Sequence, residues 1–184
     1  MSSEFQRLHL RSPLVGDVLY EADGHVHLAH SVNISEGGIL LENLPIIPEI
    51  NSLPLMFTLP QYPNFSQTNQ EILKTLKMSS LEKKILRSRA RLVRSFEGQS
   101  EVEKIFVTKI GCEFVLPTKE NKELVAQYVV DFASNILFLL GLFQRSSQLE
   151  LLRNVAELLG YDSEEKLPIL RSRVLHDYQS LESL

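Results

Sequence analysis

Hydrophobic periodicity changes at Pro117, and this change constrains the fold of the 184-residue chain more than any other feature. Before Pro117, short apolar stretches alternate with polar residues or are bounded by glycine and proline, as in β-strands. After it, apolar residues from Leu124 to Phe143 recur at helical spacing. We therefore predict a mainly β chain with added helices: a β-rich unit over residues 1–117 and a helical unit over residues 118–184.

The expected strands share β-branched or aromatic content and flanking turn residues, chiefly Gly24, Gly37-Gly38 and Gly98. They cover residues 14–20, 25–28, 31–34, 39–42, 53–59, 85–96 and 104–116. Between the fifth and sixth of these segments, residues 61–84 turn polar. That stretch is either a long mobile insertion or an insertion that carries a short helix around residues 71–77.

Three helices are expected after Pro117. Thr118 is a suitable N-cap for the first, and Gly160 a suitable C′ residue for the second, which covers about 147–159. The third begins near Ser163 or Pro168 and ends near residue 181. The first helix is apolar over most of its circumference, so either the later helices or a second subunit must cover it. We expect self-association through residues 118–184.

Composition excludes several classes of protein. The net charge of −4 and the pI of about 5.8 argue against a protein that coats long nucleic acid. A single cysteine, Cys112, excludes intramolecular disulfides and cysteine-rich zinc sites. The most apolar stretch, residues 128–143, is short for a membrane span and carries Asp131 and Asn135, so we expect a buried or partner-facing helix. The first fifteen residues lack the apolar core of a secretory signal, and we expect a cytoplasmic protein.

Signatures of catalysis are missing from the sequence. It contains no P-loop, no G-x-G-x-x-G, no G-x-S-x-G and no H-E-x-x-H. Cys112 lies in a very apolar strand, where a small core residue is more typical than a nucleophile. His25, His27 and His30 could be metal ligands, but no fourth ligand stands at a convincing spacing, and an exposed strand face followed by a turn is the favoured explanation. We expect no enzyme activity, no metal and no cofactor.

Two short motifs are more informative. Arg7 and Arg11 stand four residues apart before the first strand, and Asn33 and Ser35 precede a pair of glycines. An arginine pair can hold guanine edges or phosphates, because each guanidinium presents a planar fork of donors. Taken alone, however, the arginines are typical surface charges and the second motif is typical of a hairpin turn. Their combination and order are what make them specific.

Together, R-x-x-x-R over residues 7–11 and N-x-S-x-x-G over residues 33–38 make the chain resemble the PilZ domain family. The segment Lys109–Val115, with Gly111 and Phe114, is similar to that family's closing strand. The resemblance covers roughly residues 5–140. It implies a six-stranded antiparallel PilZ-type β-barrel, followed here by a C-terminal helical region, that binds the bacterial second messenger cyclic di-GMP.

The resemblance also implies residue roles. Arg7 and Arg11 would take the guanine Hoogsteen edges and the phosphates. Asn33 and Ser35 would hydrogen-bond guanine and phosphate from the barrel surface, and Gly38 would leave room for the ligand.

Three further positions are weaker members of the implied site. Gly37 would help the turn before Gly38, and Gly111 matches a glycine of the closing strand that can lie near the ligand. Gln6 stands where many members carry another arginine, a position that bears on ligand stoichiometry. Arg87, Arg89 and Arg91 alternate along a strand, as on a solvated face, and a ligand or partner surface is the other interpretation.

The sequence thus predicts a non-enzymatic cyclic di-GMP receptor that changes conformation or partner contacts when ligand binds. Its expected partners are cyclic di-GMP, a second copy of the chain through residues 118–184, and a protein of a motility or secretion system. The alternative is a PilZ-like structural or adaptor protein that does not sense the ligand and acts through its helical tail.

Overall fold

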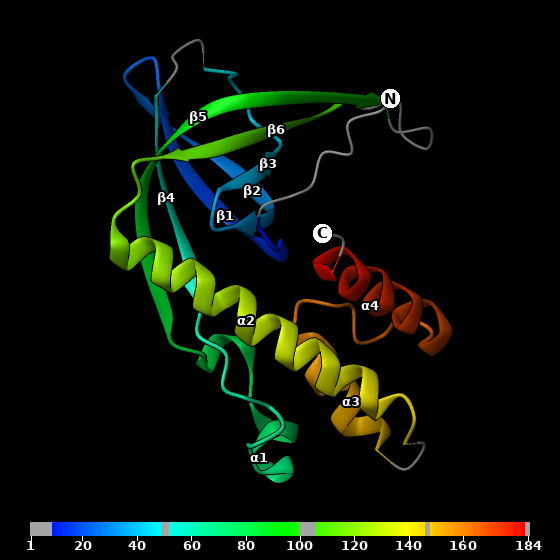
Figure 1. The fold of residues 1–184 in the computed structure, drawn as a ribbon. Helices are drawn as coiled ribbons and strands as arrows, with labels where there is room; N and C mark the ends of the chain where they lie inside the picture. The colour runs from blue at the N-terminus through cyan, green and yellow to red at the C-terminus, as the bar shows by residue number, and fades with distance from the viewer. Residues whose placement is uncertain (1–8, 49–51, 100–105, 146–147, 183–184) are drawn as a thin grey trace, which may run out of the picture. The chain divides into compact units, whose positions relative to one another are not determined.

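The computed structural model describes residues 9–48, 52–99, 106–145 and 148–182. Six strands, four α-helices and one short 3-10 helix follow one another along the chain in this part (Figure 1). They are β1 (Ser12–Ala22), β2 (His25–Ser35), β3 (Gly38–Glu42), β4 (Leu53–Pro60), α1 (Gln70–Thr75), the 3-10 helix Met78–Ser80, β5 (Lys83–Gln99), β6 (Phe106–Val115), α2 (Lys119–Leu142), α3 (Leu149–Leu158) and α4 (Leu167–Glu182).

The six strands form a closed barrel in the order β1-β2-β3-β6-β5-β4. The pairings are antiparallel, for example Leu19 opposite Met56 between β1 and β4, and Leu41 opposite Ile110 between β3 and β6. Closure leaves no strand edge unpaired, which removes the template for edge-to-edge aggregation. The predicted fold class, a six-stranded antiparallel barrel followed by helices, is confirmed.

The first hairpin shows how local sequence builds the barrel. Asp23 and Gly24 connect β1 to β2 with φ angles of 52° and 72°, and positive φ at both central residues is what a type I′ turn requires. Beyond the turn, β2 is one continuous strand, where the sequence suggested two short ones. Its pairing with β3 shifts register between Ser31 and Asn33. Such a bulge breaks the alternation of side chains, which explains the interrupted pattern in the sequence.

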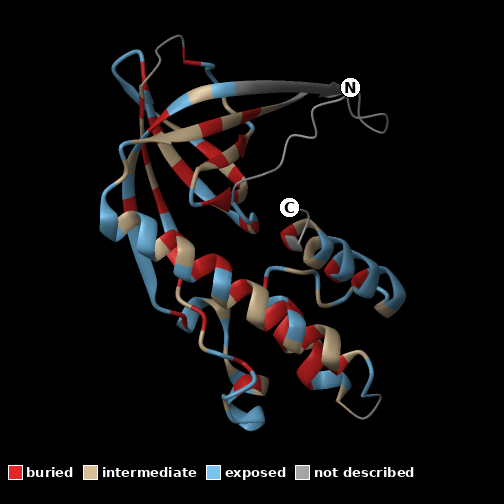
Figure 2. Ribbon diagram, viewed as in Figure 1, coloured by how far each residue is buried: buried red, intermediate tan, exposed pale blue. Residues whose placement is uncertain are grey.

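Buried residues, red in Figure 2, recur along the strands of the barrel. Because successive side chains of a strand point to opposite faces, these residues fill the barrel interior. Val18, Ile34 and Leu41 are fully buried there. Tyr20 is also buried, and its hydroxyl donates to the carbonyl oxygen of Ile46 over 2.7 Å and accepts from the Ile46 amide over 3.2 Å. The barrel core therefore also holds the connection between β3 and β4.

The polar insertion is ordered by apolar anchors. Phe65 and Leu73 are completely buried, although most of their neighbours are exposed. The ring of Phe65 lies 6.4 Å from that of Phe138 in α2. The ring of Tyr62 lies 5.8 Å from that of Tyr128, tilted to it, and 6.4 Å from that of Phe132, edge-on. The interpretation of residues 61–84 as an insertion with a short helix is confirmed by α1.

Two asparagines hydrogen-bond the backbone of this insertion. Asn135 of α2 is fully buried; its Oδ1 accepts from the Phe65 amide over 2.9 Å, and its Nδ2 donates to the Pro63 carbonyl over 2.9 Å. In α3, Asn154 Nδ2 donates to the carbonyl oxygens of Leu73 and Leu76. Buried backbone groups outside regular structure need such partners, so these side chains fix the path of the insertion.

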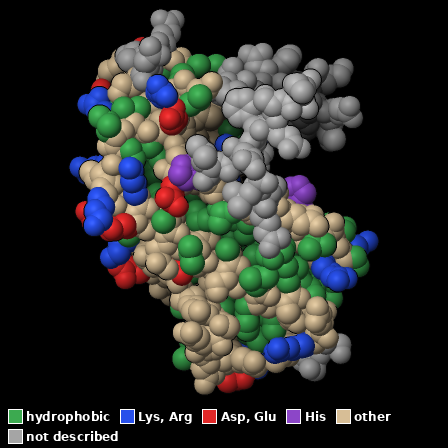
Figure 3. Space-filling view, viewed as in Figure 1, with side chains coloured by type: hydrophobic (Ala, Val, Ile, Leu, Met, Phe, Trp, Pro, Cys, Tyr) green, Lys and Arg blue, Asp and Glu red, His purple; other side chains and the backbone are tan. Residues whose placement is uncertain are grey.

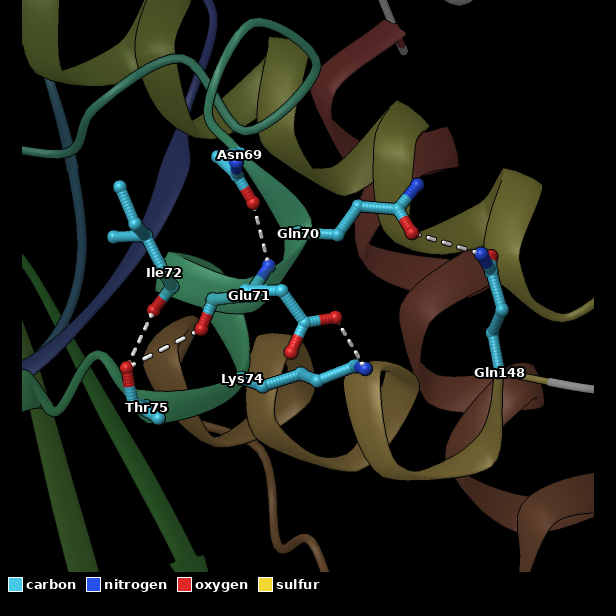
Figure 4. A network of polar contacts seen from close by, with 7 residues as sticks. All are labelled: Asn69, Gln70, Glu71, Ile72, Lys74, Thr75 and Gln148. Atoms are coloured by element: carbon cyan, nitrogen blue, oxygen red, sulfur yellow. Dashed lines mark hydrogen bonds and ion pairs between the residues drawn. The ribbon is translucent and has the colours of Figure 1, made fainter.

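The ends of α1 are set by nearby polar groups (Figure 4). Asn69 caps the helix by accepting from the Glu71 amide over 2.8 Å. Lys74 donates to Glu71 over 2.8 Å, and the hydroxyl of Thr75 donates to the last turn. Gln148, which precedes α3, donates to Gln70 over 3.1 Å and so joins the two helices.

The predicted helix boundaries are confirmed at two caps. The Thr118 hydroxyl accepts from the Asn121 amide over 3.1 Å at the start of α2. At the end of α3, Gly160 has a φ of 87°, the Tyr161 amide donates to Ala156 over 3.0 Å, and the Gly160 amide donates to Glu157 over 3.0 Å. This pair of bonds is a Schellman motif, which needs a residue with positive φ at C′.

Packing divides the chain into two compact units. Of the described residues, the barrel unit holds 13–48, 52–59, 83–99 and 106–126, and the helical unit holds 9–12, 60–82, 127–145 and 148–182. This division differs from the single boundary predicted after residue 117, because the insertion between β4 and β5 packs with the helices. Contacts between residues seventy positions apart, such as Phe65 and Asn135, leave no periodicity in the sequence. The sequence pattern therefore cannot indicate that the insertion packs with the helices.

One helix of the described chain, α2, is long and apolar enough to cross a membrane by length and composition, with a mean hydropathy of 1.6 over its most apolar window. Within the helical unit, its residues Phe132, Ile136 and Leu139 are buried, and Asn135 bonds the insertion between them. One side of α2 is therefore buried, whereas Val130 and Leu137 on it are exposed, so both predicted alternatives, a buried and a partner-facing helix, stay open.

Candidate functional site

Four of the predicted ligand-binding residues lie on one hairpin of the barrel unit. Asn33 and Ser35 end β2, Glu36 and Gly37 form the turn, and Gly38 begins β3 opposite Ser35. Ile34 between them points into the core, so Asn33 and Ser35 share the other side of the strand. The strand period therefore brings the two polar side chains of the motif together.

The side chains of this hairpin differ in how they are engaged. Asn33 is half-buried, and within the described residues no group hydrogen-bonds its amide. Ser35 is buried, and its hydroxyl donates to the Gly38 carbonyl over 3.4 Å. That distance exceeds the usual range for a hydroxyl donor, so the bond is weak. Both side chains can therefore take up a new partner at little cost.

The packing of the barrel requires a glycine at position 38. A Cβ at this position would lie 2.1 Å from the backbone oxygen of Cys112 on β6, far inside van der Waals contact. Neither Gly37 nor Gly38 has a positive φ, so the turn does not depend on them for backbone conformation. The glycine at position 38 is thus required by the close approach of β3 to β6, whatever it does for a ligand.

Gly111 joins the hairpin residues through the register of the sheet. Asn33 lies opposite Leu40 on β3, and Leu40 lies opposite Gly111 on β6. Adjacent strands are about 4.8 Å apart, which puts Asn33 and Gly111 about 10 Å from one another across the three strands. The structure therefore brings together Asn33, Ser35, Gly37, Gly38 and Gly111.

Of the two arginines of the motif R-x-x-x-R, the structure describes only Arg11. Arg11 is exposed and directly precedes β1. By its contacts Arg11 belongs to the helical unit, whereas the hairpin residues belong to the barrel unit. Arg7 and Gln6 lie outside the described residues.

Ion pairs flank the three strands of the hairpin site. Arg91 on β5 pairs with Glu113 on β6 over 2.7 Å, and Glu113 stands opposite Gly38 in register. Lys109 on β6 pairs with Glu42 on β3 over 3.7 Å. On the face shown in Figure 3, basic and acidic side chains of the barrel unit are interspersed. The sequence analysis singled out Arg91 but missed Glu113 and Lys109, whose only signal was alternation along a strand.

Cys112 is a core residue of the barrel, as predicted. Its side chain is buried, and burial raises the pKa of the thiol to about 12. A thiol with so high a pKa stays protonated at neutral pH and is a poor nucleophile.

The histidines on β2 do not converge on one point. His30 Nδ1 lies 3.0 Å from Asp17 on β1, while the rings of His25 and His27 lie 6.4 Å apart. Within the described part of the chain, no three histidine, cysteine, aspartate or glutamate side chains are placed to hold a metal ion.

Comparison with known proteins gives matches of fold. No family model matches the sequence, and no curated protein is significantly similar to it. Among solved structures, the chain is similar to the Bacillus subtilis inhibitor of motility MotI/DgrA, with 17% identity and a TM-score of 0.46 over 67% of this chain and 49% of that one. It is also similar to Klebsiella pneumoniae MrkH in complex with c-di-GMP, with 13% identity and a TM-score of 0.45 over 68% and 50%.

A third structure is the PilZ domain of Escherichia coli YcgR with c-di-GMP. Identity is 13% and the TM-score 0.41, over 68% of this chain and 89% of that one. The chain spans about half the length of the first two proteins.

Proposed function

We propose that the chain is a non-enzymatic receptor for cyclic di-GMP of the PilZ type. One observation carries the proposal: the motif N-x-S-x-x-G lies at a β2–β3 hairpin of a closed six-stranded barrel and follows R-x-x-x-R in the order that PilZ domains use. Either motif alone has an ordinary structural explanation, whereas the pair on this barrel matches a nucleotide site.

The chemistry of the hairpin suits the ligand. Cyclic di-GMP is a compact dianion with two guanines, so it needs a few well-placed donors and cations. The Asn33 amide, which no group of the described part of the chain hydrogen-bonds, offers both donors and an acceptor to a guanine edge. The weakly bonded Ser35 hydroxyl can donate to a phosphate. Arg7 and Arg11 would supply the charge, each as a planar fork that matches guanine or phosphate.

Ligand binding would reposition the segment that carries Arg7 and Arg11, because both arginines would have to meet the hairpin residues through the same ligand. Such a change gives the receptor its output, a changed set of contacts with its own helices or with a partner.

Isothermal titration with cyclic di-GMP tests the proposal directly. Wild-type protein is expected to bind, and Arg11→Ala and Ser35→Ala are expected to weaken binding. Loss of one bidentate arginine costs about 1–3 kcal/mol, or about 5- to 150-fold in affinity. Arg171→Ala, an exposed arginine of α4, is the matched control and should bind like wild type. Absence of heat from the wild type would sink the proposal.

A second candidate function follows from α2. Val130 and Leu137 are 58% and 51% exposed and stand seven residues apart, so they lie on one side of the helix. This apolar stripe favours an adaptor that assembles with itself or with a protein of a motility or secretion system through its helices. Light scattering with and without cyclic di-GMP separates the two: an assembly that forms without binding the nucleotide identifies the adaptor.

A further inference from the structure

The barrel unit contains an apolar pocket that none of the predicted cyclic di-GMP residues lines. Its volume is about 670 Å³, within the range of small-molecule sites. The walls come from strands β1, β2, β4, β5 and β6, from the first turn of α2 and from the segment between β6 and α2. In Figure 1, β4, β5 and the connection from β6 to α2 lie at one side of the barrel. Eight of its fifteen lining residues carry aliphatic, thioether or proline side chains.

The apolar wall includes side chains that are exposed to water when the pocket is empty. Val26 is 69% exposed and Leu116 is 93% exposed, while Leu19 and Met56 are half-buried beside them. Leu116 also has a φ of 46°, a region that bulky residues rarely adopt. Backbone of this kind persists only where its surroundings hold it, and it is enriched at ligand sites. A large apolar side chain held outward by strained backbone indicates that something apolar covers it.

Two cations stand in the same pocket. Arg87 and Arg89 are exposed, both line it, and their spacing of two residues puts them on one face of β5. Arg91, the next arginine on that face, is paired with Glu113. Within the described residues, by contrast, neither Arg87 nor Arg89 forms an ion pair, and Arg89 has only a 3.3 Å hydrogen bond to Ser52.

The polar part of the pocket is held in place. The Asn121 side chain in the first turn of α2 donates to the Arg87 carbonyl over 2.8 Å, which ties the helix to β5. Glu21 is the single acidic residue of the lining, so the pocket carries a net charge of about +1 from two guanidiniums and one carboxylate. A preformed apolar site with an excess of positive charge selects a ligand that is largely apolar and carries a negative charge.

We infer that this pocket binds an amphipathic monoanion, an apolar chain or ring with one carboxylate, at a site separate from that of the nucleotide. The apolar body would lie on Leu19, Met56 and Leu116, and the carboxylate would meet Arg87 and Arg89. A nucleotide fits this lining poorly, because most of the wall offers neither donors nor acceptors for a base.

Decanoate, used below its micelle concentration, is the probe for the test. Of the two methionines that the structure describes, Met56 and Met78, only Met56 lines the pocket, so its methyl resonance reports binding. We expect decanoate to shift the Met56 signal and to leave Met78 unmoved. Decanol, which lacks the charge, should bind about tenfold more weakly or worse, because hydrogen bonds to charged groups contribute at least that factor.

Three variants separate the charge from the apolar wall. Arg87→Gln with Arg89→Gln should lower decanoate affinity about tenfold and leave decanol unchanged. Val26→Trp, at an exposed position where a larger side chain is tolerated, should abolish binding of both. Arg91→Gln is the matched control, since Arg91 lies on the same strand face but outside the pocket, and it should bind decanoate like wild type.

The inference is overturned if decanoate at about 1 mM leaves the Met56 signal unmoved, or if the double glutamine variant binds it as well as wild type does. It is also overturned if the protein binds vesicles of phosphatidylglycerol through these arginines but not free decanoate. Titration of the double variant with cyclic di-GMP keeps the two proposals apart, because nucleotide binding should be unchanged in it.

Discussion

The barrel unit and the helical unit satisfy their buried backbone in different ways. In the barrel, each strand bonds its neighbours along a ladder, and hairpins such as the one at Asp23 and Gly24 set the register locally. In the helical unit, the insertion at residues 60–82 is largely irregular and depends on the side chains of Asn135 and Asn154, which lie seventy or more residues away. A ladder distributes its bonds over many residues, whereas the insertion concentrates them on two amides, so single substitutions should act very differently in the two units.

The largest effect is expected from Asn135→Leu. Leucine keeps the approximate volume but removes both hydrogen bonds to the insertion, leaving the Phe65 amide and the Pro63 carbonyl without their partner. Each unsatisfied buried group costs about 1–3 kcal/mol, so the free energy of unfolding should fall by about 3–4 kcal/mol. Urea denaturation measures the loss, and hydrogen exchange should show it in residues 60–82 while the barrel strands stay protected.

Gln127→Leu is the matched control for that variant. It makes the same replacement on the same helix at an exposed amide, which bonds only Asp131 within the described residues, and should change stability by less than about 0.5 kcal/mol. Equal losses in both variants would contradict the role given to Asn135.

A smaller effect is expected from Gly38→Ala in the barrel. The new Cβ would meet the Cys112 carbonyl oxygen at 2.1 Å, and because that oxygen is a backbone atom that cannot rotate away, β3 and β6 must separate. Overpacking of this kind costs about 2–3 kcal/mol. Here the loss of hydrogen-exchange protection should appear in β3 and β6 and spare the insertion. Gly141→Ala, in α2 where a Cβ meets nothing within 4 Å, should instead stabilise the protein by up to about 1 kcal/mol.

The smallest effect expected is a difference between the two units in the pH at which they begin to lose stability. Burial raises the pKa of Cys112 in the barrel from 9.0 to about 12, and that of Tyr62 in the helical unit from 10.0 to about 12. Both groups are neutral when folded and ionise more readily when unfolded, so their stabilisation is complete below the unfolded pKa and is lost as pH rises through the folded one. The barrel should therefore begin to weaken near pH 9, and the helical unit near pH 10.

Urea unfolding of wild type, Cys112→Ala and Tyr62→Phe over this range tests the order. Above pH 9, the free energy of unfolding of the wild type should fall relative to that of Cys112→Ala by about 1.4 kcal/mol per pH unit. Relative to Tyr62→Phe, it should fall in the same way only above pH 10. A difference that stays constant with pH would show that the group in question is solvated when folded.

Much of the candidate nucleotide site could be predicted from the sequence, because its parts are close along the chain. Asn33, Ser35 and Gly38 fall within six residues, and strand alternation with one turn is enough to put the first two on one side of a hairpin. The alignment of Gly111 with them needed the register of β3 on β6. The pocket beside Leu116 left no trace in the sequence, since its walls come from five strands, a helix and the segment between β6 and α2.

The sequence by itself determined the elements of this protein: the barrel strands, the short helix in the insertion, and helix ends at Thr118 and Gly160. Each of these depends on residues within a few positions of one another, through periodicity, capping or the φ angle of one glycine. Only the tertiary structure decided that residues 60–82 pack with the helices, that Asn135 serves the Phe65 backbone, and that Gly38 must admit the Cys112 carbonyl. Those contacts join residues that are distant in the sequence, and a distant pair becomes specific only when the chain has closed the loop between them.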